Sequence, residues 1–448
     1  MHFKHSVMVI AALGSLAGDG ALGKESSAAQ LDSIYPELDA FYIDLHQTPE
    51  LSGHEEKTSA KLAERLRRLG YEVTTGVGGY GVVALMRNGN GPTLLLRTDM
   101  DALPVQEKTG LPYASKVTAP GKDGGTVGVM HACGHDIHMT SLLGTATLLA
   151  KMKDRWQGTL FLIGQPAEET VNGAEAMMKA GLFTKFPKPN FAIALHDTHR
   201  LPAGKIGYTP GYSTASADTV SITIFGRGGH GAYPHMTVDP IVIAARTILS
   251  LQTIVARENN PIDPAVVTVG SIRGGTKANI IPDEVNLQLT VRSHKEEVRQ
   301  HLLSAIERIT KAESAAAGAP KEPSIVRVPG EATPAVYNDP ALTKRVVGVL
   351  AREFGDSNVT ELPPTMGAED FAVYGRAGVP AVIFGLGAVE PQKFEKAKAT
   401  GATLPGIHSA EFAPDRERTL RTGVSALTAV ALDLLAKPKT QGRRVTRP

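Results

Sequence analysis

The chain has 448 residues, of which 42% are hydrophobic and 21% are charged, and it carries a net charge of +2. This composition is typical of a globular protein of two or three domains and excludes a disordered chain. The near-neutral charge, without a basic patch interleaved with aromatic side chains, gives no reason to expect nucleic acid as a partner. The basic segment 438–448 is expected to be a solvated tail. The single cysteine, Cys133, excludes an internal disulfide.

The N-terminus has the pattern of a secretory signal. Lys4 and His5 precede an apolar run over residues 7–17, and mostly small residues follow it up to Gly23. This run is too short to span a membrane stably, and we identify no later segment that is apolar enough to do so. We therefore expect residues 1–23 to direct export to the periplasm or the medium, with no stable membrane insertion after their removal. Retention of the segment as a membrane anchor is the alternative.

The first predicted elements of the mature chain include a helix and a strand hairpin. Ser52 and Glu55 have the spacing of a capping box and predict that a helix starts there. Strands are predicted at 71–75 and 82–86, and the loop between them, residues 76–81, matches the pattern G-x-G-x-x-G. The dinucleotide-binding form of this pattern is followed by a helix, whereas a strand follows here. We therefore predict a hairpin loop and reject nucleotide binding and hydride transfer.

Three predicted buried strands, at 93–97, 159–163 and 191–195, are each followed by residues that can ligate a metal or move a proton. Open α/β sheets place their sites beyond the carboxyl ends of such strands. A single polar residue after a strand is unremarkable, but repetition after three strands predicts a site at this edge of the sheet. The residues concerned are Asp99, Asp101, Glu168, Glu169 and His196.

Between the first two of these strands, residues 131–138 concentrate three histidines, one aspartate and the cysteine. Thiolate and imidazole are ligands that zinc and similar divalent metals prefer. The two-residue spacing from Cys133 to His135 lets both side chains reach one metal, and a surface histidine cluster is the alternative. The apolar segment 139–152 that follows predicts a buried helix, so the ligands would lie at the N-terminal mouth of a core helix.

The middle of the chain changes to alternating strands with two helices, in the order β-α-β-β-α-β. This order is that of the split-βαβ, ferredoxin-like fold, here inserted between two parts of an α/β domain. A returning core strand at 381–387, a loop with His408 and a closing helix at 419–436 complete the second part. The predicted elements of the insertion are 219–226, 239–255, 266–272, 285–291, 296–317 and 324–328. The expected divisions are 31–212 and 333–437 for the two parts of the α/β domain and 213–332 for the insertion.

Several motifs occur in one fixed order along the chain. They are D-M-D-A-L-P at 99–104, H-A-C-G-H-D at 131–136, Q-P-A-E-E at 165–169, G-H-G-A-Y-P at 229–234, N-I-I-P at 279–282, M-G-A-E-D-F at 366–371, and His408. This set resembles the amidohydrolase branch of the aminoacylase and glutamate carboxypeptidase-like di-metal peptidase family, which includes hippurate hydrolases, auxin-conjugate hydrolases and other N-acyl amino acid amidohydrolases. The resemblance extends over nearly all of residues 31–435.

This resemblance implies an α/β fold: a di-metal exopeptidase-like three-layer catalytic domain with an inserted ferredoxin-like α+β lid, through which subunits often form a homodimer. It also implies two divalent metal ions per subunit, bridged by the thiolate of Cys133. The ligand set would be completed by His135, Glu169, His196 and His408. Glu168 would be the general base, and Asp101 would orient a ligand.

Two positions, Asp99 and Cys133, distinguish the branches of the resembled family. Carboxypeptidase-like members of the wider family have histidine at the position of Asp99 and aspartate at that of Cys133, whereas the amidohydrolase branch shares the residues seen here. Because a thiolate bridge suits several metals, the choice among zinc, manganese, cobalt and nickel stays open.

Adjacent residues on an extended segment point opposite ways, so either Glu168 or Glu169 is expected to be free for proton transfer.

The inserted domain contributes three candidate residues. His230 lies in a glycine-flanked loop and is expected to stabilise the oxyanion formed at the amide carbon. Asn279 and Arg292 are candidate substrate-binding residues, since Arg292 could clamp a carboxylate with two hydrogen bonds. A solvated loop histidine and a surface arginine are the alternatives. Asp136 and His138 are expected to support the metal ligands from behind.

We therefore expect a metal-dependent enzyme that cleaves the amide bond of N-acyl amino acids, hippurate-like or other aminoacyl conjugates, into a carboxylic acid and an amino acid. The expected partner is this small-molecule substrate. A metallo-dipeptidase or carboxypeptidase is the alternative within the same chemistry. A noncatalytic periplasmic metal- or ligand-binding protein is the alternative from another class, and the presence of Glu168 as a base argues against it.

Overall fold

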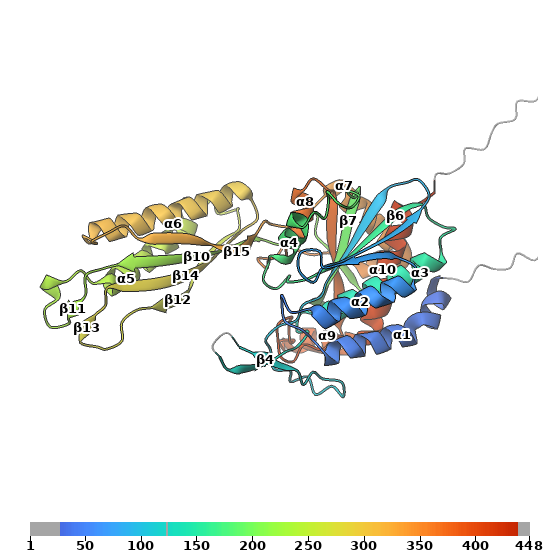
Figure 1. Cartoon of the computed structure of the whole chain (residues 1–448), viewed down its shortest axis with the longest axis horizontal. Coiled ribbons are helices and arrows are strands. Elements are labelled where there is room, and N and C mark those ends of the chain that lie inside the picture. The colour runs from blue at the N-terminus through green and yellow to red at the C-terminus, as the bar shows by residue number, and fades with distance from the viewer. Residues whose placement is uncertain (1–26, 122–123, 438–448) are drawn as a thin grey trace, which may run out of the picture.

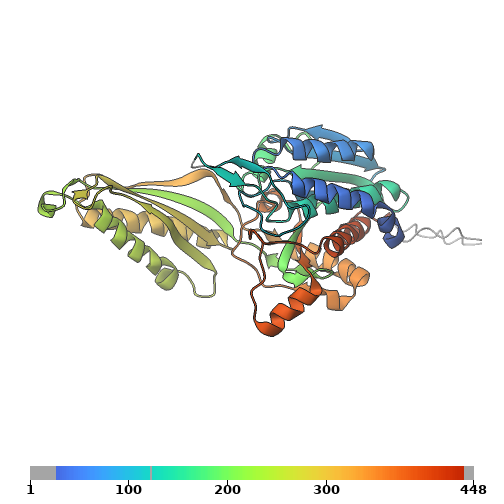
Figure 2. The same ribbon diagram turned by 90° about the horizontal axis from the view of Figure 1, so that it is seen from below.

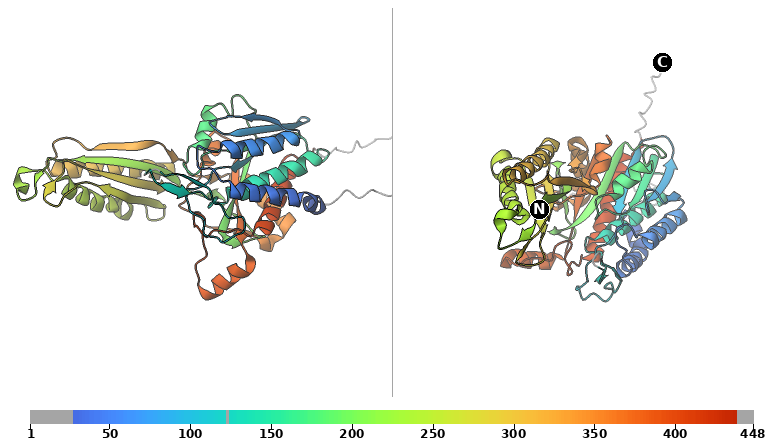
Figure 3. Two further views of the ribbon diagram at one scale, coloured as in Figure 1. Left: turned by 60° about the horizontal axis from the view of Figure 1, so that its bottom comes forward. Right: turned by 60° about the vertical axis from the view of Figure 1, so that its left-hand side comes forward.

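The structure, a computed structural model, describes residues 27–121 and 124–437. The expected signal peptide, residues 1–23, and the expected basic tail, residues 438–448, lie outside the described residues. The chain forms a main body built on one large sheet and an elongated inserted body that projects from it (Figure 1). Figure 2 and Figure 3 show the same projection from other directions.

The main body is organised by an eight-stranded sheet. In spatial order its strands are β1 (Glu72–Thr75), β2 (Val82–Asn88), β6 (Gly158–Gln165), β3 (Thr93–Asp99), β7 (Phe191–Pro202), β18 (Ala381–Val389), β8 (Ile206–Tyr208) and β17 (Val359–Glu361). The four central strands β6, β3, β7 and β18 run parallel to their neighbours within this group. β1 and β2 form an antiparallel hairpin, which confirms the predicted hairpin around the glycine loop 76–81.

Alternating side chains of the central strands supply two cores, one on each face of the sheet. In β3, Leu94 and Leu96 face one core and Leu95 faces the other, as expected for successive strand residues. The first core is covered by α1 (Ser27–Gln47), α2 (Glu56–Arg68), α3 (His135–Lys151), α7 (Pro340–Phe354) and α10 (Arg416–Leu434), and the second by α4 (Gly173–Lys179) and α8 (Ala372–Arg376). The main body is thus the three-layer α/β arrangement that the sequence predicted.

The inserted body consists of a four-stranded antiparallel sheet with two helices. Its elements are β10 (Ser216–Phe225), α5 (Pro240–Thr253), β12 (Ala265–Arg273), β14 (Glu284–Ser293), α6 (Glu296–Ala316) and β15 (Ser324–Thr333). The spatial order β12-β14-β10-β15 confirms the predicted ferredoxin-like arrangement. Every second residue of β14, including Leu287 and Leu289, is buried in a core shared with α5 and α6. The residues between them lie on the opposite face of the sheet.

Short elements complete the described chain. β9 (Gly211–Tyr212) pairs with β16 (Tyr337–Asn338) where the chain leaves and re-enters the main body. Near this junction, His294 Nε2 lies 3.0 Å from the carbonyl oxygen of Thr365. The exact domain boundaries stay a prediction. The other short elements are β4 (Thr118–Pro120), β5 (Thr126–Gly128), β11 (Gly229–His230), β13 (Ile280–Ile281), α9 (Pro391–Thr400) and the single turns Pro234–Met236, Ile254–Glu258 and Asp356–Asn358.

Two predicted helix starts differ from the structure. The N-cap residue of α2 is Glu55, and it makes no side-chain capping bond, so the predicted capping box was wrong. Ser52 instead donates a hydrogen bond to the carboxylate of Asp101, at 2.6 Å. α3 begins at His135 rather than after the histidine cluster, so part of the cluster forms the first turn of the helix.

One helical stretch, Pro240–Glu258, is long and apolar enough to cross a membrane by length and composition alone. The expectation that no later segment meets this criterion was therefore wrong. One face of the stretch, including Ile243 and Leu251, is buried in the core of the inserted body, as in the core helix of a folded domain. The other face leaves Val242 and Leu249 exposed, by 55% and 72%. Exposed apolar side chains on one side of a helix mark a candidate contact surface.

Asp218 of β10 is buried and binds two arginines of the inserted body. Arg299 donates to it from two nitrogens, at 2.6 and 2.9 Å, and the half-exposed Arg327 forms a further ion pair.

We predict that Asp218→Ala lowers the free energy of unfolding of the inserted body by about 3 kcal/mol, because it removes the main partner of a buried charge. Denaturant unfolding followed by circular dichroism measures this change. Arg327→Ala, which removes the exposed partner, should cost at most about 1 kcal/mol, and equal losses for both variants would contradict the prediction.

Candidate metal centre

The parallel strands of the main sheet bring distant residues to one edge. β3 ends at Asp99 and is paired in register with β6, which ends at Gln165. β7 runs parallel to β3 on its other side and carries His196. Because the carboxyl ends of parallel strands meet at one edge, Asp99, Asp101 and His196 converge there. His196 was predicted to follow a strand but lies inside β7, which continues to Pro202.

The turn before α3 places Cys133 and His135 at the same edge. Gly134, between them, has a φ of +73°, a conformation that glycine adopts without steric cost. A side chain at this position would also clash with the carboxylate of Asp197. The residue between the two predicted ligands therefore has to be glycine, both for its backbone angle and for this close approach.

The predicted ligand atoms form two groups that share Cys133. The sulfur of Cys133 and ring nitrogens of His135 and His196 all lie within 4.8 Å of one another. Cys133, Glu169 and His408 form a second group of the same size. In it, His408 Nε2 lies 3.2 Å from the sulfur and 3.3 Å from a carboxylate oxygen of Glu169. One sulfur between two donor groups is the arrangement expected of a thiolate that bridges two metal ions.

The donor set fits divalent metal ions. Among the described residues, His135 Nε2 is buried without a hydrogen-bond partner, which is costly unless another group binds there. Burial raises the pKa of the Cys133 thiol well above its usual range, and the charge of Glu169 raises it further. A thiolate at this position therefore needs a cation beside it. Sulfur, imidazole and carboxylate together suit zinc, manganese, cobalt and nickel.

Glu168 and Glu169 lie in a turn, not on the extended segment that was predicted. Both carboxylates approach His135 Nε2, each at 3.9 Å, so the expectation that they point opposite ways was wrong. The turn contains left-handed backbone at Ala167 and Val171, with φ of +52° at both. Such strained conformations cost about 1–3 kcal/mol each and cluster at functional sites.

The two glutamates differ in their neighbours. Glu169 shares a donor group with Cys133 and His408, which suits a metal ligand. Glu168 is 5% exposed, and burial together with the charge of Glu369 raises its pKa well above the usual range. Glu168 also belongs to a donor group, with His135 and Glu169, so its burial beside Glu369 is the feature that suits it to proton transfer.

Asp101 connects two of the predicted ligands. One of its carboxylate oxygens lies 3.3 Å from His135 Nδ1, and the same nitrogen lies 2.7 Å from its backbone carbonyl. The other carboxylate oxygen accepts hydrogen bonds from Ser52 Oγ at 2.6 Å and from the backbone N–H of Glu169 at 2.9 Å. Asp101 thus holds one ligand side chain and the backbone of another, which fits the orienting role expected for it.

Behind the ligands lies a buried chain of polar contacts that includes a residue missed from the sequence. His138 Nδ1 lies 2.7 Å from a carboxylate oxygen of Asp99. The backbone N–H of Asp197 donates to His138 Nε2 at 2.9 Å, so the ring proton faces Asp99. The carboxylate of Asp197 is buried 3.5 Å from His196 Nδ1. The one signal for Asp197 in the sequence is that it directly follows His196.

Arg97 is fully buried among three carboxylates. It forms ion pairs with Asp99 at 2.6 Å, Glu369 at 2.8 Å and Asp370 at 3.1 Å. Burial alone would lower its pKa, but the charges of Glu369 and Asp99 outweigh this effect and raise the pKa well above its usual value. In the sequence, Arg97 is only the last residue of a predicted strand. In the structure it ties the motif at 366–371 to β3.

Asp136, expected behind the metal ligands, contacts α1 instead. Its carboxylate lies 2.7 Å from His46 Nδ1, and His46 Nε2 lies 3.2 Å from Glu107. Burial lowers the pKa of His46, but the bonds to Asp136 and Glu107 outweigh it and raise the pKa to about 9. This buried cluster attaches the first turn of α3 to the end of α1.

The three candidates of the inserted body lie apart from the metal donors of the same chain. His230 and Asn279 are neighbours, since the N–H of Gly231 donates to the carbonyl of Asn279 at 2.9 Å. They belong to the β11 and β13 region, at the end of the inserted body remote from the main body (Figure 1). Arg292 lies at the other end of β14, on the sheet face opposite the helices, and its Nε donates to Thr290 at 3.0 Å.

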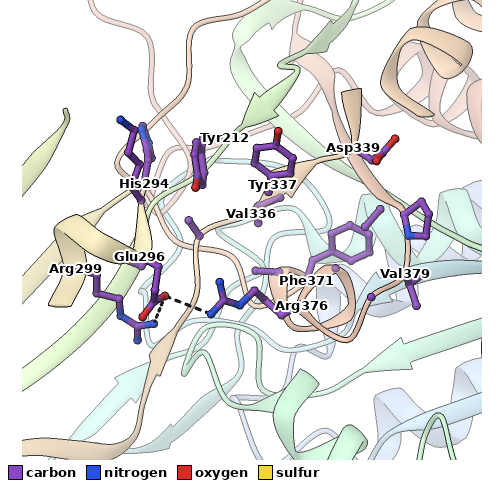
Figure 4. Close-up of a pocket in the computed structure, with 18 residues that line it drawn as sticks. Tyr212, His294, Glu296, Arg299, Val336, Tyr337, Asp339, Phe371, Arg376 and Val379 are labelled. Atoms are coloured by element: carbon purple, nitrogen blue, oxygen red, sulfur yellow. Dashed lines mark hydrogen bonds and ion pairs between the residues drawn. The ribbon is translucent and has the colours of Figure 1, made fainter. Parts of the chain in front are cut away.

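Two cavities lie near the junction of the bodies. One, of about 300 Å³, opens beside the metal donors and has His196 in its wall. The other, of about 700 Å³, has none of the predicted site residues in its wall (Figure 4). Its wall combines the stacked rings of Tyr212 and His294 with an ion pair of 3.4 Å between Arg376 and Glu296. That ion pair joins the main body to the inserted body.

Comparisons with known proteins identify the family of the chain. Thermostable carboxypeptidase 1 of Saccharolobus solfataricus is 38% identical over 392 residues, 87% of this chain and 93% of the relative. N-acetyl-L-cysteine deacetylase of Bacillus subtilis is 37% identical over 354 residues, 79% of this chain and 81% of the relative. The crystal structure of a dinuclear metal binding peptidase from Bacillus subtilis has a TM-score of 0.73 and 30% identity, over 90% of this chain and 99% of the other. Residues 95–430 match the family model of peptidase family M20/M25/M40, and the chain therefore belongs to this family.

Proposed function

We propose that the protein hydrolyses the amide bond of N-acyl amino acids and releases a carboxylic acid and an amino acid. The observation that carries this proposal is the sharing of Cys133 by two groups of metal donors, with the buried Glu168 beside them. A relative of 37% identity is named for the deacetylation of N-acetyl-L-cysteine, which breaks a bond of this kind.

The residues at the sheet edge have separable tasks in this reaction. Two divalent metal ions would be held by Cys133, His135, Glu169, His196 and His408. Metal ions bound there would polarise the amide carbonyl and make water a stronger acid. Glu168 takes the proton of the attacking water and passes it to the leaving nitrogen. Asp101 keeps His135 and the backbone of Glu169 in position throughout.

A panel of paired substrates tests this function. We predict that the purified protein, supplied in turn with zinc, manganese, cobalt and nickel, hydrolyses N-acyl amino acids and loses this activity after chelation. Carboxypeptidase activity is the second candidate, because a relative of 38% identity bears that name. Each N-acyl amino acid is therefore compared with a dipeptide of the same C-terminal residue. A higher kcat/KM for the dipeptide assigns the second function, and hydrolysis of neither with any metal contradicts both.

The two adjacent glutamates should respond differently to the same change. Glu168→Gln is predicted to keep its bound metal and to lose kcat by about 10²-fold or more, because it removes the proton carrier and no ligand. Glu169→Gln is predicted to lose metal, because it removes a donor of the group that contains Cys133. Elemental analysis of both variants, beside the rate, decides the assignment. A metal-free Glu168→Gln protein would reverse the two roles.

We infer further that two subunits pair through the inserted body. β12 is an edge strand of the four-stranded sheet, and an edge strand offers unpaired backbone groups to a second chain. The side chains of Val242 and Leu249 on α5 and of Ile272 on β12 are exposed and apolar. His230 lies far from the metal donors of its own chain, so such a pairing would give it a role at the donors of the other subunit.

His230 provides the test of this pairing. We predict that His230→Ala keeps the fold and the metal content while kcat falls by about two to three orders of magnitude, since an oxyanion donor is lost. KM should change much less, because the contact strengthens in the transition state. Mixing this variant with Glu168→Gln and allowing subunit exchange should restore activity. Unchanged kcat in His230→Ala, or no rescue despite demonstrated exchange, contradicts a role across subunits.

We also propose that the protein is exported. The proposal rests on Lys4, His5 and the apolar run 7–17, which together have the form of a secretory signal. N-terminal sequencing of the protein recovered from the periplasm or the medium should find a start near residue 24. Recovery of the intact N-terminus from the cytoplasm would contradict export.

A further inference from the structure

We propose that the larger cavity at the junction of the two bodies is a second small-molecule site, which binds an aromatic carboxylate and couples that binding to the position of the inserted body. The cavity has a volume of about 700 Å³, which is within the range of small-molecule sites. Among the residues that the structure describes, none of the predicted metal ligands belongs to its wall. The inference goes beyond the hydrolysis proposed above and concerns a different part of the molecule.

Both bodies and both connections between them form the wall of this cavity. The main body contributes residues of α8 and of the segment before β18, and the inserted body contributes residues at the start of α6. The two connections contribute Tyr212 of β9 and Tyr337 of β16, which are paired in register. A ligand that fills the cavity therefore touches both bodies at once (Figure 4). Such a ligand favours the arrangement of the bodies in which it makes all its contacts.

Aromatic side chains form one part of the wall. The ring of Tyr212 stacks on that of His294, with planes 10° apart and centroids 5.9 Å apart, and it meets the edge of Tyr337 at 5.0 Å. Figure 4 shows the three rings in a row. Tyr337 is 50% exposed, so part of its ring surface is open to a ligand. Because aromatic rings pair favourably in stacked and edge-to-face arrangements, this part of the wall suits a ligand with an aromatic ring.

The acidic side chains of the wall already have partners. The carboxylate of Asp339 accepts a hydrogen bond from the backbone N–H of Leu342 at 2.7 Å. The carboxylate of Glu296 accepts one from Gln300 at 2.8 Å and forms an ion pair of 3.4 Å with Arg299. A positively charged ligand would therefore have to compete with existing contacts for either carboxylate.

One basic side chain of the wall has donors to spare. Arg299 and Lys295 are held by short ion pairs with Asp218 and Asp263, each at 2.6 Å. Arg376 is 59% exposed, and its ion pair with Glu296 is long, at 3.4 Å. A guanidinium group has five N–H donors and binds a carboxylate through two of them.

The wall therefore offers an anion partner and a ring surface at separate places. In Figure 4 the guanidinium of Arg376 lies apart from the row of rings. One ligand can thus place its carboxylate at Arg376 and its aromatic ring against Tyr212 and Tyr337. Free aromatic acids and aromatic amino acids both have this chemistry.

Isothermal titration calorimetry with 3-phenylpropionate tests the site, on the metal-loaded protein and again after chelation. We expect a Kd of about 1 mM or tighter, unchanged by chelation because the cavity lies apart from the metal donors. 3-Cyclohexylpropionate, which lacks the aromatic ring, should bind at least about threefold more weakly. 3-Phenylpropylamine, which reverses the charge, should bind at least about tenfold more weakly. Comparison with L-phenylalanine distinguishes an amino acid from a free acid as the preferred ligand.

Two variants separate ligand binding from the structural role of the ion pair. Arg376→Gln and Glu296→Gln both remove the ion pair that joins the bodies. Arg376→Gln should weaken the binding of 3-phenylpropionate by about tenfold or more, because the carboxylate loses its charged partner. Glu296→Gln should bind it at least as tightly as the wild type, because Arg376 keeps its charge and loses a competing partner. Circular dichroism shows whether each variant retains the fold.

The rate of hydrolysis tests the coupling between the bodies. The inserted body carries His230, so a ligand that holds it in one position should slow turnover. With saturating N-acyl amino acid, 3-phenylpropionate should lower kcat of the wild type and of Glu296→Gln by about fivefold. It should leave kcat of Arg376→Gln unchanged at the same concentration.

The proposal is overturned by absence of binding, by binding that disappears on chelation, or by equal weakening in the two variants. Inhibition that is purely competitive with the substrate also overturns it, because the ligand would then occupy the metal centre. If the wild type cleaves no N-acyl amino acid, the hydrolase proposal fails, and calorimetry with the two variants still decides whether the junction cavity is a binding site.

Discussion

The parallel pairing of β6, β3, β7 and β18 is the constraint on which the rest of the structure depends. It brings the carboxyl ends of the strands to one edge, so residues distant in the sequence meet without long loops to carry them. The register is fixed because alternate residues fill different cores: Leu95 faces one and Leu94 and Leu96 face the other. A slip by one residue would exchange the two faces of a strand. Packing on both sides of the sheet thus determines where Asp99 and His196 stand.

The same edge gathers several buried acidic side chains. Asp99, Asp101, Glu168, Glu369 and Asp370 are all at most 5% exposed. The buried guanidinium of Arg97 forms ion pairs with three of them, Asp99, Glu369 and Asp370. Buried carboxylates that lack a positive partner are costly. The family's divalent metal chemistry is therefore consistent with the electrostatics of the fold as well as with the ligand types.

Much of this organisation can be predicted from the sequence, because the patterns that indicate it involve residues close together in the chain. The apolar strands, the Cys133–His135 spacing and the β-α-β-β-α-β order of the insertion each depend on neighbouring residues. Other features depend on tertiary structure. The turn that brings Glu168 and Glu169 together requires left-handed backbone at Ala167 and Val171, which the identities of these residues do not reveal. Ser52 has the spacing of a helix cap, yet its partner Asp101 lies 49 positions away.

The metal donors lie far apart in the sequence, so they are synthesised at different times. Cys133 and His408 touch in the folded protein but are 275 residues apart in the chain. Synthesis proceeds from the N-terminus, so the thiol is made long before the histidine that completes its second donor group. A fragment that ends before this histidine keeps the first group and lacks the second. The donor group that contains His408 can therefore bind metal only after most of the chain has been made. Until then Cys133 lacks one of the two donor groups whose metal would shield its sulfur from oxidation.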